Sequence, residues 1–411
     1  MATLAASRAA WRALSPAARL LVLNGLAFNL GFYMMMPFLA QHLGGTLGMA
    51  GWAAGLVMGM RVFSQQGLFL LGGTLGDRIG YRPAIIVGCL VRSAGFALLG
   101  WAAQLPLLLL AAFLTGFAGA LFTPCAQAYL AGECRDAAQR QQAFALHNLA
   151  SEAGMLLGPL AGMLLGSVSY RITGLVSGAV FLLLAVLQWR LLPAELPRAR
   201  RQQPAVWQQW RALLHNPPFL RFCALSCCYS LLFHQLYLAV PAYIDSHRHA
   251  GGLLGSLFTV TALIGVCLQL PASRLVQRRL GAAAGMGLGL ALMGGSYLLL
   301  PLLAAWPVVA VLGMAVLFSL GSILCYPLFA AHLPHYAGQQ ALGSYYGFQA
   351  SAGGCVALLG NVLIGAALGP AGSVPPLPVW LLLALAGCLA GGLLYRQLRQ
   401  EAASGAQHAA A

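Results

Sequence analysis

The chain has 411 residues, of which 60% are apolar and only 7% are charged, and its mean hydropathy is +0.81. Soluble domains are about one quarter charged, so this composition excludes an ordinary soluble protein and indicates a chain that crosses a membrane many times. The 22 basic residues are all arginines and are spread over many loops. That spread argues against a nucleic-acid-binding domain, despite a net charge of +15.

Twelve apolar stretches are long enough to cross a bilayer as helices, which takes about 17 to 25 residues each. The first is too long for the core of a signal peptide and predicts a retained helix. We predict an all-α integral membrane protein with twelve transmembrane helices in two six-helix bundles. The bundles comprise residues 1–192 and 219–411, the second with a short cytoplasmic tail, and a polar cytoplasmic linker at 193–218 joins them. The predicted spans are residues 20–42, 52–75, 84–103, 106–130, 143–167, 171–192, 219–243, 252–273, 281–303, 307–330, 343–368 and 377–395.

The arginines are sorted by side of the membrane. If the N-terminus is cytoplasmic, 18 of the 22 arginines fall in cytoplasmic segments, and only Arg171 and Arg248 fall outside. The remaining two, Arg61 and Arg92, lie within predicted spans. Positive residues concentrate in cytoplasmic loops, so both termini are predicted to be cytoplasmic.

The two halves resemble each other at an offset of about 200 residues, as in transporters built from parallel six-helix repeats. The dipeptide-spaced pair Arg78 and Gly80 matches Arg279 and Gly281, and Pro124 matches Pro327. These matches predict a duplicated six-helix unit.

The segment between the second and third spans reads Gly-Thr-Leu-Gly-Asp-Arg-Ile-Gly-Tyr-Arg over residues 73–82. Glycine permits a tight turn, and a carboxylate there can cap a helix or pair with an arginine. We interpret Gly73, Asp77, Arg78, Gly80 and Arg82 as a conformational latch between helices. The segment resembles the loop 2–3 signature of the major facilitator superfamily, with Tyr81 in place of the first basic residue of the final pair.

The fifth span carries Gly154, Gly158, Pro159 and Gly162, which resemble the antiporter signature of drug-exporting members of that superfamily. Glycines four residues apart share one helical face and permit close approach of a neighbouring helix. The stretches at 59–67 and 92–96 are similar to bacterial multidrug-resistance proteins of the MdtH type. This resemblance implies a proton-driven exporter. The chain departs from the pattern at Asn24, where such exporters often carry an acid, and at Ala112, where an arginine is usual.

Glu152 lies about nine residues into the fifth span, roughly 14 Å deep at 1.5 Å per residue. An acid at that depth is expensive and is usually turned inward and used. With Asn24 uncharged, Glu152 is the leading candidate for a proton-coupling site. Arg61 and Arg92 are its candidate partners, and they either bind an anionic substrate group, hold Glu152 charged, or form a static ion pair with it.

Polar and aromatic residues in the predicted pore-lining spans form a candidate substrate site that suits a neutral, zwitterionic or anionic amphiphile. His147 and His234 are either proton relays or hydrogen-bonded core residues. The candidate substrate-binding residues are Asn24, Asn29, Tyr33, His234, Gln235, Tyr326, Tyr346 and Gln349, with Tyr129, Tyr229, Tyr237 and Tyr345 as further members of the set.

We therefore predict a secondary transporter of the bacterial inner membrane that exports a small organic, drug-like molecule in exchange for protons. The alternatives are export of an endogenous metabolite such as a siderophore, and uniport or import without proton coupling. No nucleotide-binding loop or catalytic constellation is present in the sequence, so no enzyme activity and no cofactor are expected. Asp245, His247 and His249 are interpreted as a wet loop rather than a metal site. The expected partners are the substrate and the lipid bilayer, with no nucleic acid, and the expected state is a monomer.

Overall fold

The computed structural model describes residues 11–12, 14–134, 137–166, 168–193, 213–247, 252–275, 279–337, 342–368 and 374–410. Regular structure within these ranges is entirely helical. The chain divides into two compact units, Met1–His42 with Leu56–Arg201, and Leu43–Gly55 with Gln202–Ala411. Most of the predicted linker, at 194–212, lies outside the described residues.

The helices up to residue 191 are long and close to the predicted spans. α2 begins after Ser15, whose hydroxyl accepts a hydrogen bond from the Ala18 backbone at 3.1 Å, with Pro16 in the first turn. The elements are α2 (Pro16–Gln41), η1 (His42–Thr46), α3 (Gly51–Val62), η2 (Phe63–Gly67), α4 (Phe69–Ile79), α5 (Tyr81–Trp101), α6 (Leu105–Glu133), α7 (Ala137–Gly166) and α8 (Tyr170–Leu191).

The helices after residue 213 form the second unit. α14 packs against α16 and α18, and α11 packs against α17. α14 and α18 approach closely because glycines face each other, as at Gly294 and Gly387. The elements are α10 (Pro217–Ser226), α11 (Cys228–His234), α12 (Ala239–Asp245), α13 (Leu253–Leu275), α14 (Gly281–Ser296), α15 (Leu299–Leu302), α16 (Pro307–Ala337), α17 (Leu342–Ala367) and α18 (Leu377–Ala410).

Each of the twelve predicted spans coincides with helix. Ten helical stretches in the described part of the chain are long and apolar enough to cross a membrane, and α13 contributes a shorter apolar helix at Leu253–Gln269. The second predicted span is divided into α3, the π-helical turn η2 and α4. Within η2 the Ser64 hydroxyl donates to the Arg61 carbonyl at 3.0 Å. Such π-helical insertions are frequent at functional sites.

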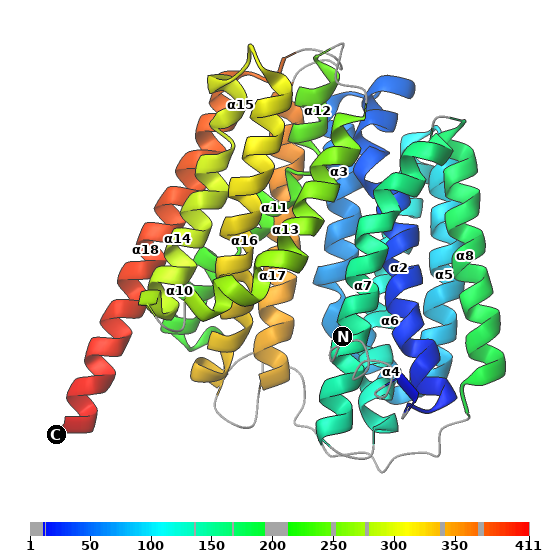
Figure 1. Ribbon diagram of the computed structural model, residues 1–411, viewed down its shortest axis with the longest axis horizontal. Coiled ribbons are helices and arrows are strands. Elements are labelled where there is room, and N and C mark those ends of the chain that lie inside the picture. The colour runs from blue at the N-terminus through cyan, green and yellow to red at the C-terminus, as the bar shows by residue number, and fades with distance from the viewer. Residues whose placement is uncertain are drawn as a thin grey trace. The chain divides into compact units, whose positions relative to one another are not determined.

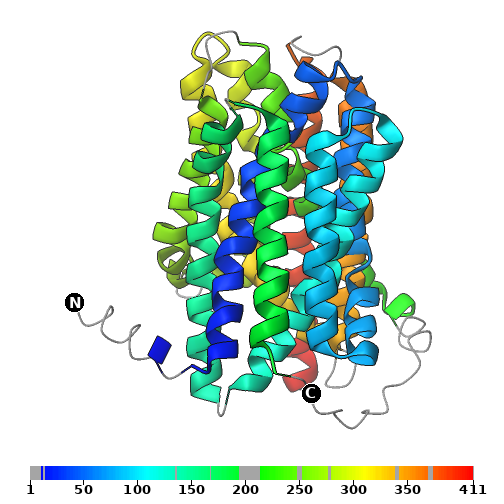
Figure 2. The ribbon, with the colours of Figure 1, turned by 90° about the vertical axis from the view of Figure 1, so that its right-hand side faces the viewer.

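In the first unit α2 lies between α7 and α8, as Figure 2 shows for the blue helix, and α5 packs against α6 and α8 (Figure 1). The face of α7 that meets α2 is the glycine face predicted from the sequence. A Cβ atom at Gly154 or Gly162 would collide with a backbone carbonyl of α2, and one at Gly158 would lie 2.5 Å from the Cβ atom of Tyr33. Bare backbone at these positions therefore permits the two helices to pack.

The predicted repeat is visible in the backbone. Gly80 separates α4 from α5 at φ +94°, and its counterpart Gly281 begins α14 at φ +75°. Positive φ is open to glycine and strained for other residues. Both units therefore use a glycine for the same left-handed turn, 201 residues apart in the sequence.

Candidate functional site

Arg92 of α5 is the most deeply buried cation in the described part of the first unit, with 1% of its surface exposed. Its guanidinium carbon lies 3.5 Å from the ring centroid of Phe28, and 5.0 and 5.5 Å from those of Phe181 and Phe96. A desolvated cation–π contact of this kind contributes about 2 kcal/mol. Arg92 Nε and Nη1 are buried and have no hydrogen-bond partner among the described residues.

Four helices bring these rings together. Phe28 of α2 stacks on Phe122 of α6 at 4.9 Å and meets Phe181 of α8 edge-on at 5.7 Å. Phe181 also stacks on Phe96 of α5 at 5.3 Å. Gly31 of α2 makes room for Phe181, since a Cβ atom there would lie 2.8 Å from that ring. Arg92 is thus enclosed by apolar faces from several helices.

Arg61, at the end of α3, belongs to the same region. It donates from Nη1 to Gln65 Oε1 at 2.8 Å, and its guanidinium carbon lies 4.9 Å from the Phe32 ring centroid. A Cβ atom at Gly119 of α6 would lie 3.2 Å from both Arg92 Nη1 and Gln65 Nε2, so these two side chains meet beside that glycine. The structure therefore joins the two predicted arginines through Gln65, which the sequence reasoning missed. The signal was its place beside a second glutamine in an otherwise apolar span.

Two fully buried amides add to the polar interior of the first unit. Asn24 of α2 and Gln188 of α8 are both 0% exposed, and none of their side-chain polar atoms has a partner in the described part of the chain. Buried polar groups are almost always hydrogen-bonded to protein or water. Asn24 was among the predicted site residues, and Gln188 was missed although it is an amide within an apolar run.

Glu152 lies in α7 and is partly buried. Its Oε2 atom is fully enclosed and has no hydrogen-bond partner within the described ranges. The static ion pair with Arg61 or Arg92 that the sequence left open is absent from this structure. His147, five residues earlier, lies 3.3 Å from the Leu21 carbonyl through Nδ1, so it is anchored to α2.

The remaining predicted residues of the first unit contact α2 and its neighbours. Asn29 donates to the Gly25 carbonyl at 2.9 Å, one turn back on its own helix. Tyr33 packs edge-on against Phe32 at 5.0 Å and lies over Gly158. Tyr129 donates to the Pro193 carbonyl at 3.3 Å.

In the second unit Gln235 forms a buried amide pair with a residue that sequence reasoning missed. Gln235 Nε2 donates to Asn361 Oδ1 at 3.0 Å, and the two side chains are 0% and 1% exposed. His234, the preceding residue, is within 2.7 Å of the Ser230 carbonyl through Nδ1. Asn361 stands alone as an amide within the apolar run at 352–368, which was the available signal.

The predicted tyrosines of the second unit fall into different surroundings. Tyr326 stacks on Tyr229 at 5.2 Å and is 61% exposed, and Tyr229 shares a 2.9 Å hydrogen bond with Ser322. Tyr346 donates to the Ala330 carbonyl at 2.7 Å. Three further members of the set make separate contacts: Tyr237 packs on Phe258, Tyr345 accepts from Asn216 at 3.2 Å, and Gln349 donates to Ser226 at 3.0 Å.

The predicted latch is described in part. Gly80 forms the turn between α4 and α5, and Arg82 donates from Nη2 to the Trp189 carbonyl at 2.6 Å, near the end of α8. Cations near helix C-termini are stabilising, because the last carbonyls have no partner within the helix. Arg78 is exposed, while the side chain of Asp77 lies outside the described part of the structure, as do the surroundings of Gly73.

The loop after α12 was interpreted as wet. His247 Nδ1 lies 2.9 Å from the Tyr243 carbonyl, and His249 falls outside the described residues. In the part of the chain that the structure describes, no group of three or more His, Cys, Asp or Glu side chains could hold a metal ion.

Helices that span a membrane, broken at π-turns and carrying buried arginines and amides, define a multi-spanning membrane transporter, and the chain belongs to the Major Facilitator Superfamily, whose family model matches residues 21–361. It is 39% identical over 375 residues to an uncharacterised MFS-type transporter of Mycobacterium tuberculosis, covering 89% of each chain. It is 27% identical over 384 residues to the multidrug resistance protein MdtH of Photorhabdus laumondii, covering 93% of this chain and 94% of that one.

The solved structures agree on the fold. The crystal structure of the nucleoside transporter NupG matches with a TM-score of 0.82 at 12% identity, over 93% of this chain and 100% of the other. The POT family transporter PepTSo matches with a TM-score of 0.73 at 15% identity, over 93% and 98%. The chain is therefore a transporter and not an enzyme.

Proposed function

We propose that this transporter is a proton-coupled exporter of small amphiphilic organic molecules in the bacterial inner membrane. The likeness to proteins named MdtH supports the exporter class and the membrane. The observation that carries the proposal is Glu152, an acid within a membrane span whose buried Oε2 has no partner in the described chain.

Glu152 is suited to carry a proton because nothing in the described structure commits its charge. A carboxylate held in an ion pair would stay ionised through the transport cycle. An unpaired carboxyl group instead responds to water, so it releases its proton when wetted and keeps it when enclosed. Movement of α7 against α2 across the glycine face would change that environment. The acid and the glycine motif therefore act together in this proposal.

The cationic and aromatic region of the first unit supports a preference for substrates with an anionic or neutral polar group. Arg61 and Arg92 contribute positive charge, and Phe28 and Phe32 contribute apolar faces. A polycation would meet like charge there. We propose Asn24, Asn29 and Tyr33 as further contacts, with His234, Gln235, Tyr326, Tyr346 and Gln349 as contacts from the second unit.

Efflux from energised cells tests the coupling. Cells expressing the protein are loaded with a carboxylated fluorescein or with ethidium, and efflux is followed with and without a protonophore. Protonophore-sensitive efflux of the anionic dye that exceeds the rate in empty-vector cells is the expected result. Efflux that persists undiminished with the protonophore would leave the uniport alternative and refute proton coupling.

A further inference from the structure

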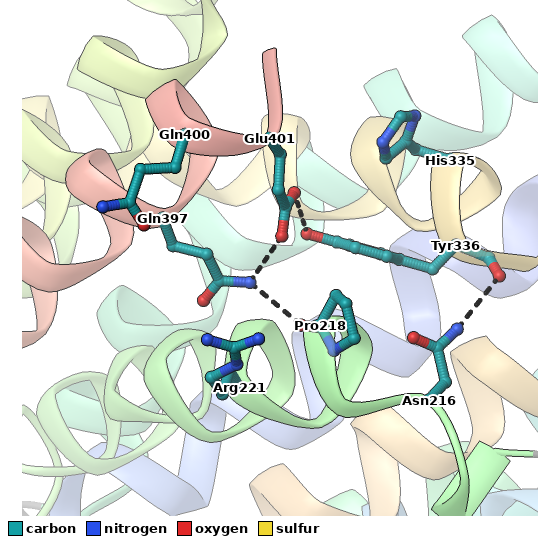
Figure 3. Close-up of a pocket in the computed structure, with 8 residues that line it drawn as sticks. All are labelled: Asn216, Pro218, Arg221, His335, Tyr336, Gln397, Gln400 and Glu401. Carbon is teal, nitrogen blue, oxygen red and sulfur yellow. Dashed lines mark hydrogen bonds between the residues drawn. The ribbon is translucent and has the colours of Figure 1, made fainter. Parts of the chain in front are cut away.

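A pocket of about 430 Å³ lies among α10, α16 and α18 of the second unit, away from every residue assigned to transport above (Figure 3). Each of these helices contributes residues near one end of its membrane span: Pro217–Asp245, Pro307–Tyr336 and Leu377–Ala403. The pocket is therefore at the level where a bilayer meets water. The arginine distribution predicts that this side is cytoplasmic. The lining comprises Asn216, Pro218, Arg221, His335, Tyr336, Gln397, Gln400 and Glu401.

The pocket is held open by a network that uses only part of its polar capacity. Glu401 accepts from the Tyr336 hydroxyl at 2.7 Å and from Gln397 Nε2 at 2.8 Å. Gln397 Nε2 also donates to the Pro218 carbonyl at 2.9 Å, which ties α18 to α10. Asn216 caps α10 by accepting from the Phe219 backbone at 3.2 Å. These bonds join all three helices at the pocket wall.

Opposite charges line this pocket without meeting. Arg221 is exposed, and its one hydrogen bond runs from Nε to the Pro217 carbonyl of its own helix at 3.5 Å. Its two terminal nitrogens make no hydrogen bond or ion pair with a described residue, and Glu401 likewise forms no ion pair. Figure 3 shows Arg221 on α10 below and Glu401 on α18 above, with Tyr336 beside them. A group that occupies the space between them can contact both.

The unused groups specify the chemistry of that ligand. A guanidinium with free terminal N–H groups matches a phosphate, which it binds in bidentate fashion. A carboxylate has about four lone-pair positions, of which two are used here. Gln397 Oε1 is a buried acceptor with no partner in the described chain. Glu401 and Gln397 together therefore suit a primary ammonium, which brings three N–H donors.

We propose that this pocket binds a group carrying both a phosphate and a primary ammonium, as in the headgroup of phosphatidylethanolamine. Arg221 binds the phosphate, and Glu401 with Gln397 Oε1 binds the ammonium. Phosphatidylcholine shares the phosphate but offers no N–H to these acceptors. Phosphatidylglycerol has the phosphate alone and leaves the carboxylate without a partner. The site thus distinguishes three lipids of equal chain length by their headgroups.

Native mass spectrometry of the full-length protein with these three lipids tests the proposal. The wild type is expected to retain phosphatidylethanolamine at least about tenfold more than either other lipid, as the loss of a hydrogen bond to a charged group implies. Arg221→Gln and Glu401→Gln should each remove that preference. Arg399→Gln is the matched control, because Arg399 lies on α18 outside the pocket and contacts Tyr395.

A soluble arm separates the two sources of this chemistry. Glycerophosphoethanolamine that displaces the lipid, with the same loss in both variants, supports a site open to soluble ligands as well. Retention of the lipid in its presence supports the membrane as the source. Equal retention of all three lipids, or a preference unchanged in Arg221→Gln, would overturn the proposal. Arg221→Gln decides if Glu401→Gln fails to fold, because Arg221 bonds only within its own helix in the described structure.

Discussion

The guanidinium group of Arg92 lies over the ring of Phe28, 3.5 Å from its centroid, with almost no exposed surface and with two nitrogens that have no partner among the described residues. A cation held by rings alone forgoes the hydrogen bonds that usually offset burial of charge. Such a group is retained at a cost in stability, which is common at functional sites. Its removal should therefore affect transport and stability in opposite directions.

Arg92→Met tests that relationship. Methionine fills a similar space without charge, so we expect an unchanged or higher melting temperature in detergent together with loss of anionic-dye efflux. Arg171→Met is the control, because Arg171 lies 4.3 Å over Trp101 but is exposed. A marked fall in melting temperature for Arg92→Met, with efflux retained, would show that Arg92 is a structural residue.

The contact between α7 and α2 predicts a position-dependent effect of glycine substitution. Gly158→Leu should disrupt packing against Tyr33, with a loss of about 1 to 3 kcal/mol of stability and of transport. Gly166→Leu, on the same helix, should change neither, because no atom lies within 4 Å of a Cβ atom there. Melting temperature and dye efflux measure both effects. Equal behaviour of the two variants would contradict the proposed role of the glycine face.

The left-handed turns predict a matched pair of backbone effects. Gly80→Ala and Gly281→Ala should each destabilise the protein by about 1 to 2 kcal/mol, because alanine is strained at positive φ. Space is not the reason, since the nearest atom to a Cβ at Gly80 is 3.5 Å away and none lies near one at Gly281. Gly392→Ala serves as control in an open helical position. Thermal unfolding that does not separate these variants from the control would refute the strain argument.

The buried amide pair predicts non-additive stability. Gln235→Leu or Asn361→Leu alone leaves the other amide buried without its partner, which costs about 1 to 3 kcal/mol. The double variant should lose less than the sum of the two single losses, because no unpaired amide remains at that position. A double-mutant cycle by thermal unfolding measures the coupling. Strict additivity would mean that the 3.0 Å hydrogen bond contributes nothing measurable.

Much of the fold was predictable because its determinants are local. Hydropathy marks the spans, and the matched glycines at 80 and 281 mark turns that only this residue adopts without strain. Helix ends were less well predicted. The fourth predicted span, 106–130, lies within a helix that extends over Leu105–Glu133, and α18 continues to Ala410 well past the predicted 395. Hydropathy detects the part of a helix that lies in lipid, and not where its hydrogen bonding stops.

The site was less predictable, because its contacts join helices distant in sequence. Arg92 stood out as a charge within a span, but nothing in the sequence distinguishes Phe28 from the other seventeen phenylalanines. The packing of α2, α5 and α8 selects it. The π-helical turn η2 was missed for a related reason, since an apolar run with a few polar residues does not reveal which hydrogen bonds its backbone makes.

Glu152→Gln in proteoliposomes tests the central claim most directly. The variant keeps the shape of the side chain but cannot carry a proton, so we expect gradient-driven transport of the anionic dye to be lost while counterflow, which needs no net proton movement, continues. Glu133→Gln is the matched control, since that acid bonds to Ser15 at the end of α6. Gradient-driven transport that continues at the wild-type rate in Glu152→Gln would contradict the assignment of Glu152 as the proton-coupling residue.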